Sequence, residues 1–167
     1  MICRGAAVFD FKNSLNIVLH EPEIPGNTGT IGRLCVGLEA TLTLIEPLGF
    51  SLADKYLKRA GLDYWPHLKL QVLPDFQHFL NLVESNGGQV FAFTTKTRNP
   101  YCHAQFQRGD FLLFGKETKG LPADILQRYS NTLCTLPMTG PIRSLNLSMA
   151  VGVAAYEAMR QISGGFQ

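Results

Sequence analysis

Residues 136–161, LPMTGPIRSLNLSMAVGVAAYEAMRQ, leave the chain few ways to fold. The segment starts at the end of an expected strand, passes through a loop with two prolines and a glycine, and continues as a long, nearly all-apolar helix. Such a helix has to be buried, because it offers little polar surface to water. Four polar side chains nevertheless gather where the helix begins: Arg143, Ser144, Asn146 and Ser148. We expect Ser144 to cap the helix, and the cluster to cap it, to bind a ligand, or to do both.

Strands and helices alternate along the chain, which predicts an α/β fold with a mostly parallel sheet flanked by helices. Short apolar or β-branched runs predict strands at 15–20, 41–46, 70–73, 89–95, 110–114 and 132–136. Helices are predicted from Asn27 or Thr28, either of which can cap the first one, and over 53–60, 75–84 and 123–129. Because no repeat or linker divides the chain, we expect residues 1–167 to form a single domain, with residues 1–14 as a loosely attached extension.

Composition adds expectations about surroundings and partners. Charged residues make up 17% of the chain against the about 25% usual in soluble proteins, so we expect a second copy of the chain to cover part of the surface. The net charge is only +2, so binding of nucleic acid requires that positive charge be clustered. No apolar run approaches the ~20 residues of a membrane span, and we expect a soluble cytoplasmic protein without a membrane partner. The four cysteines lack the spacing of a zinc site or a disulfide framework, which predicts reduced thiols and no metal.

Three strand ends carry glycine and polar residues, namely those followed by the loops after His20, Phe114 and Leu136. Ligands of parallel sheets bind at the carboxyl ends of strands, so the three loops predict one composite site. The loop after His20 is not a dinucleotide fingerprint, because its glycines are spaced GxxGxxG and not GxGxxG. The loop after Phe114 lacks the spacing of a nucleotide-phosphate loop.

These loops bring no residues suited to covalent catalysis. Neither a nucleophile–base pair nor a carboxylate dyad is evident near them, and the four histidines are scattered along the chain. A site with many hydrogen-bonding groups and no nucleophile favours a function in positioning substrates. Group transfer from a pre-activated cofactor fits that description.

The three loops together resemble the signature motifs of a known family. LNIVLHEPEIPGNTGTIGRLC (15–35), FGKETKGLP (114–122) and segment 136–161 resemble those of the SPOUT superfamily of RNA 2′-O-methyltransferases. The segments IEPLGF and LKRAGLDYW are similar to its TrmL/YibK group, the tRNA (cytidine/uridine-34) 2′-O-methyltransferases. The resemblance covers about residues 15–162. It implies a SPOUT fold with a C-terminal trefoil knot, S-adenosyl-L-methionine as cofactor, a homodimer, and tRNA methylated at the wobble nucleotide as substrate.

The resemblance also implies roles for individual residues. Arg33 would stabilise the developing alkoxide of a ribose 2′-OH, or position that hydroxyl, since an arginine cannot ordinarily lose a proton. Arg33 and the ribose would be oriented by Asn27, Glu117 and Asn146. The cofactor would be bound by Phe93, Thr94, Gly115, Leu136 and Ser144. RNA would be bound by Lys116, Lys119 and Arg143, with Lys55, Lys58, Arg59, Lys96 and Arg98 as further candidates.

Two alternative functions stay open at this point. The same chemistry could serve another RNA site such as rRNA, or the chain could be a non-catalytic RNA-binding dimer that keeps the fold. The presence of the whole proposed catalytic set argues against the second alternative. Three positions depart from the residues usual in the group, Gly26, Thr30 and Met149, and the last of them concerns substrate preference more than the reaction.

Overall fold

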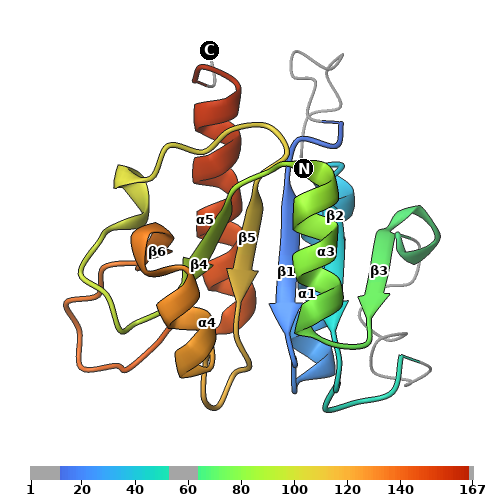
Figure 1. Ribbon diagram of the computed structural model, residues 1–167, viewed down its shortest axis with the longest axis horizontal. Coiled ribbons are helices and arrows are strands. Elements are labelled where there is room, and N and C mark those ends of the chain that lie inside the picture. Colours follow the sequence, from blue (N-terminus) through green and yellow to red (C-terminus); the bar gives the residue numbers. More distant parts are fainter. Residues whose placement is uncertain (1–11, 53–63, 166–167) are drawn as a thin grey trace.

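The computed structural model describes residues 12–52 and 64–165, which form one six-stranded sheet with helices on both faces (Figure 1). All the paired strands are parallel, in the order β3-β2-β1-β5-β4-β6, which confirms the predicted α/β class. The strands are β1 Asn16–His20, β2 Thr41–Ile45, β3 Lys69–Leu73, β4 Val90–Phe93, β5 Phe111–Phe114 and β6 Leu133–Cys134. The α-helices are α1 Pro25–Gly37, α3 Phe76–Asn86, α4 Ala123–Arg128 and α5 Leu147–Ile162. The predicted helix over 53–60, with Lys55, Lys58 and Arg59, lies outside the described residues.

Two separate cores cover the two faces of the sheet. Helices α1 and α5 pack side by side on one face, where Ile31 and Ala155 belong to the same apolar cluster as the inward side chains of β1, β2, β4 and β5. Helices α3 and α4 pack on the other face, where Phe79 and Ile125 are buried (Figure 1). Both faces of the central strands are therefore dry, which is why their sequences read as continuous apolar runs.

Helix α1 begins earlier than its polar residues suggest. The N-cap is Ile24, without a side-chain cap, and Pro25 is the first helical residue. Proline suits this position because its φ is already helical and it has no N–H to satisfy. The prediction that Asn27 or Thr28 caps the helix is therefore wrong. Both lie buried in the first turn, and this leaves the side chain of Asn27 available for contacts with other segments.

Helix α5 begins later than predicted, so the prediction of Ser144 as its cap is also wrong. The N-cap is Asn146, whose Oδ1 accepts hydrogen bonds from the Ser148 amide at 2.9 Å and from the Ser148 hydroxyl at 2.7 Å. An asparagine side chain at this position satisfies one of the amides that the first helical turn leaves unpaired. Ser144 remains in the preceding loop, where it is exposed.

The N-terminal extension attaches earlier than predicted. Ser14 is fully buried, its carbonyl accepts a hydrogen bond from the Gly109 amide at 2.9 Å, and its hydroxyl accepts one from Arg108 at 2.6 Å. Ser14 therefore belongs to the folded domain, and residues 1–11 of the predicted extension lie outside the described residues. Within the described ranges, no helix is long and apolar enough to cross a membrane.

Candidate functional site

A cavity of about 480 Å³ opens at the carboxyl ends of β4 and β5, beside the first turns of α1 and α5. Its walls come from all three loops that the sequence places in one composite site. The loop after β1 contributes Ile24 and leads to Asn27, the loop after β5 contributes 115–120, and the segment before α5 contributes 143–146. Parallel strands place these loops together because their carboxyl ends share one edge of the sheet.

The floor of the cavity is apolar and one of its walls is tightly folded. The rings of Phe93 and Phe114 stack at 4.7 Å between centroids, at the ends of β4 and β5. Gly115 packs so closely on the other end of its loop that a Cβ there would lie 2.1 Å from the carbonyl carbon of Gly120. Gly120 has a φ of +67°, a left-handed conformation that glycine adopts without strain. The loop 115–120 is therefore a closed turn whose side chains are held in defined places.

Three of the four predicted catalytic residues form a continuous hydrogen-bonded chain. The Nδ2 of Asn146 donates to the Oδ1 of Asn27 at 2.9 Å, and the Nδ2 of Asn27 donates to Oε1 of Glu117 at 3.0 Å. An ionised carboxylate can only accept, so Glu117 sets the orientation of both amides. Asn27 is buried, whereas Asn146 is exposed toward the cavity that it lines. The second Nδ2 hydrogen of Asn146 can therefore donate to a ligand.

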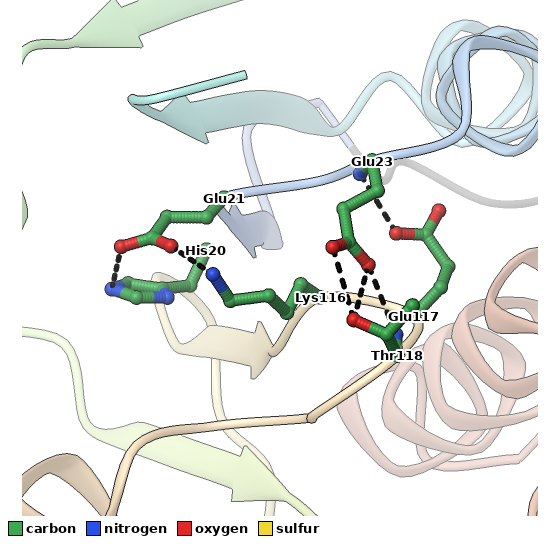
Figure 2. Close-up of polar contacts among 6 residues, drawn as sticks. All are labelled: His20, Glu21, Glu23, Lys116, Glu117 and Thr118. Carbon is green, nitrogen blue, oxygen red and sulfur yellow. Dashed lines mark hydrogen bonds and ion pairs between the residues drawn. The ribbon is translucent and has the colours of Figure 1, made fainter. Parts of the chain in front are cut away.

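Glu117 is itself held by the loop after β1 (Figure 2). Its carboxylate accepts hydrogen bonds from the amides of Glu23 at 2.8 Å and Ile24 at 3.3 Å. In return, the Glu23 carboxylate accepts from the Thr118 amide at 3.0 Å and from its hydroxyl at 2.8 Å. The bonds from Thr118 lower the pKa of Glu23, so this carboxyl stays ionised near neutral pH.

A third contact between the same loops joins Lys116 to Glu21 (Figure 2). Hydrogen bonding to Glu21 raises the pKa of Lys116, which keeps the ammonium charged. Beside this pair lies His20, 4% exposed, whose Nδ1 has no hydrogen-bond partner in the part of the chain that the structure describes. Burial lowers the pKa of His20, although the neighbouring Glu21 carboxylate opposes the shift. His20 is therefore neutral at pH 7.

The other predicted residues divide into those that line the cavity and one that does not. All five predicted cofactor residues line it: Phe93, Thr94, Gly115, Leu136 and Ser144. So do the three predicted RNA-binding residues, Lys116, Lys119 and Arg143. Lys119 and Arg143 are exposed, whereas the Lys116 ammonium is held by Glu21.

Arg33, the fourth predicted catalytic residue, is not among the residues that line the cavity. It is exposed on α1, with its guanidinium carbon 5.0 Å from the centroid of the Tyr64 ring. The Tyr64 hydroxyl donates to the carbonyl of Gly29 at 2.6 Å, which fixes the ring against the same helix. The structure thus holds Arg33 in place, but away from the chain of Asn146, Asn27 and Glu117.

Three residues of the site were missed by sequence reasoning: Glu21, Glu23 and Thr118. Glu21 and Glu23 are each 95 positions from their partners in the second loop, so no local spacing could have paired them. Their only sequence signal is that two carboxylates directly follow a buried strand. Among the described residues, no group of three or more His, Cys, Asp or Glu could hold a metal ion.

Comparison with known proteins gives one consistent result. The SpoU rRNA Methylase family matches residues 14–156. The tRNA (cytidine(34)-2'-O)-methyltransferase of Escherichia coli strain K12 is 47% identical over 149 residues, which cover 89% of this chain and 94% of the relative. A solved structure from work on 2-OH methylation of C/U34 on tRNA is 49% identical, with a TM-score of 0.85 and coverage of 90% and 97%. An AdoMet-bound rRNA methyltransferase from Sinorhizobium meliloti is 26% identical, with a TM-score of 0.80, and covers 89% of this chain and 57% of that one.

Proposed function

The chain belongs to the SpoU rRNA Methylase family, and on that premise we propose that it transfers a methyl group from S-adenosyl-L-methionine to a ribose 2′-hydroxyl of tRNA. The nucleotide is number 34, cytidine or a modified uridine, as the relatives named for that position suggest. One structural observation carries the proposal: the chain of Asn146, Asn27 and Glu117 lies on the wall of a cavity that suits a small cofactor.

The residues of the cavity fit S-adenosyl-L-methionine. Its volume of about 480 Å³ falls in the range of small-molecule sites, about 300–1,000 Å³. The stacked rings of Phe93 and Phe114 offer an apolar surface, and Thr94, Ser144 and the backbone near Gly115 and Leu136 offer polar groups. When bound, the cofactor supplies an electrophilic methyl group on a sulfonium sulfur.

The chain's own residues would position the nucleophile. The exposed Nδ2 of Asn146 donates to a ribose oxygen, and Glu117 fixes the direction of that donation through Asn27. A well-oriented pair of reacting groups can gain about 7–11 kcal/mol relative to the same groups free in solution. Positioning of this kind accounts for catalysis without a protein nucleophile.

Arg33 would stabilise the negative charge that develops on the 2′-oxygen as its proton leaves to water, before that charge is consumed in the new O–CH3 bond. Because Arg33 lies outside the cavity of its own chain, this role requires tRNA binding or a second copy to bring Arg33 and the ribose together. We expect Arg33→Ala to bind the cofactor normally and to lose turnover. Wild-type turnover in Arg33→Ala would remove Arg33 from the mechanism.

The proposal includes a homodimer that covers the outer face of α5. Met149, Val153 and Tyr156 are 62%, 43% and 53% exposed, and their spacing puts them in one stripe on this helix. We expect Val153→Asp to dissociate the dimer in sedimentation experiments. Val72→Asp is the matched control, since Val72 is similarly exposed, at 39%, on the edge strand β3. Equal effects of the two substitutions would place the interface elsewhere.

The C-terminal trefoil knot, the single methyltransferase domain and the cytoplasmic location belong to the same proposal. Support for the knot comes from the cavity, which is walled jointly by loop 115–120 and the segment that leads into α5. These are the two segments that such a knot would cross.

The substrate is tested by nucleoside mass spectrometry of RNA from cells with and without the gene. We expect loss of 2′-O-methylation at tRNA position 34 in the cells without it. An unchanged tRNA with a loss at an rRNA site would favour the rRNA alternative. Absence of cofactor binding in calorimetry would favour the non-catalytic RNA-binding dimer.

A further inference from the structure

Two loops from distant parts of the sequence hold each other by reciprocal contacts, which we call the clasp: residues 21–24 after β1 and residues 116–118 after β5 (Figure 2). Each residue of the second loop contacts the first. Lys116 pairs with Glu21, Glu117 accepts from the amides of Glu23 and Ile24, and Thr118 donates twice to Glu23.

Glu117 is the clasp side chain that bonds to the side chain of Asn27, whose backbone amide also bonds to the carbonyl of Ile24 at 3.1 Å. One oxygen of its carboxylate, Oε2, accepts from the Glu23 amide, while Oε1 accepts from Ile24 and from the Nδ2 of Asn27. Movement of the loop 116–118 would therefore move the acceptor that orients Asn27, and through it Asn146. Glu23 contacts two residues of the other loop: its carboxylate accepts from Thr118, and its amide donates to Glu117. The two interactions therefore close a ring between the loops.

We propose that Glu23 and Thr118 are positioning residues for the methyl transfer, acting together through Glu117 on Asn27 and Asn146. The inference rests on the proposed function, because it assumes that Asn146 contacts the substrate ribose. Neither residue needs to touch the reacting atoms. Their charge-assisted hydrogen bonds hold Glu117 in one place, and the reaction depends on that placement.

A cycle of two substitutions tests this. Glu23→Gln keeps the size of the side chain and removes its charge, and Thr118→Val keeps the shape and removes the hydroxyl. We expect each to lower kcat by about tenfold, with the dissociation constant of S-adenosyl-L-methionine unchanged within about twofold. If the residues act as a unit, the double variant also loses about tenfold. A loss of about a hundredfold, the product of the single effects, would overturn the proposal.

Rescue and control variants separate positioning from general damage. Thr118→Ser restores the hydroxyl and should recover kcat to within about twofold of wild type. Glu46→Gln and Thr97→Val make the same chemical changes at positions outside the clasp and should leave kcat unchanged. A kcat that is unaffected in Thr118→Val, or that serine fails to recover, would contradict a positioning role.

Hydrogen exchange tests the clasp without any methylation assay. The amides of Glu23 and Ile24 donate to Glu117 and make no bond to residue 118. Because Thr118 holds the same loop in place, we nevertheless expect both amides to exchange faster in Thr118→Val than in wild type. Unchanged exchange at these amides would show that the clasp is not a unit. If the wild-type protein methylates no tRNA while these amides respond as expected, the proposed function fails and the clasp stands.

Discussion

The adjacent strands β1 and β2 are each followed by the dipeptide Glu-Pro, but the two dipeptides lie in different surroundings. Strands β1 and β2 pair in parallel with His20 opposite Ile45, so that Glu21-Pro22 follows one strand where Glu46-Pro47 follows the other. Glu21 is half-buried, has a φ of +51°, and pairs with Lys116. Glu46 is exposed beside a shallow hollow formed with Pro47, Leu48, Phe50, Ser51, Leu52 and Pro74.

The difference arises from the strand on the other side. Strand β1 borders β5, at the point where the strand order reverses, and the loop after β5 brings Lys116 and Glu117 against it. Strand β2 borders β3, whose following residues start α3. A Glu-Pro strand end therefore becomes part of a site only where the topology supplies a partner loop, as the general rule for parallel sheets predicts.

The largest effect on catalysis is expected from substitution of Glu117, the hydrogen-bond acceptor in the loop after β5. Glu117→Ala removes three accepted hydrogen bonds and the orientation of Asn27, so we expect kcat to fall by about a hundredfold. Glu46→Ala makes the same change after β2 and should stay within about twofold of wild type. Single-turnover methylation of tRNA measures both. Similar losses in the two variants would erase the distinction between the strand ends.

A second prediction concerns the backbone of the same loop. Gly115→Ala places a Cβ 2.1 Å from the backbone of Gly120, and neither segment can move without opening the turn. We expect a loss of about 1–3 kcal/mol in the free energy of unfolding and weaker cofactor binding in calorimetry. Gly140→Ala is the control in the loop before α5, because a Cβ there meets nothing within 4 Å. Normal cofactor affinity in Gly115→Ala would show that the turn can relax.

A third prediction separates the two lysines of this loop. Lys119 is exposed, so Lys119→Met should lower the slope of log affinity for tRNA against log salt by about 0.7–1. The Lys116 ammonium pairs with Glu21, so Lys116→Met should change the slope less. Filter binding at several salt concentrations measures the slopes. Equal changes would mean that RNA displaces Glu21 from Lys116.

The smallest expected effect is on the pH dependence of stability. The pKa of buried His20 is lowered from 6.5, so in acid the unfolded chain binds a proton that the folded chain resists. Stability should therefore be retained above about pH 6.5 and decline as pH falls below it. His20→Ile copies the residue that β2 has at this position, and should flatten that decline in thermal unfolding. An unchanged pH profile would mean that other groups dominate.

Much of the fold was predictable because local patterns report burial and turn chemistry directly. The buried strands and the helix over 75–84 were predicted and are confirmed, and that helix is α3, capped by Asp75 and ended by Gly87. The starts of α1 and α5 were predicted wrongly for different reasons. Helix α1 has no side-chain cap and starts at Pro25 after Ile24, so the search for a polar cap misplaced it. At α5, Ser144 and Asn146 compete as caps, and local sequence does not say which one the packing selects. The three motifs also predicted that their loops would line one cavity, and the structure places them there.

The sequence alone determined the α/β class, the meeting of the loops after His20, Phe114 and Leu136, and the family resemblance. Each of these depends on patterns of residues that are adjacent in the chain. Only the tertiary structure decided that Asn27 bridges Asn146 and Glu117, and that Glu23 and Thr118 close a clasp behind them. It also decided that Arg33 faces outward over Tyr64. The hydrogen bonds of Asn27 and of the clasp join residues about 90 to 120 positions apart, and they depend on β1 and β5 being neighbours in the sheet, which no local pattern encodes.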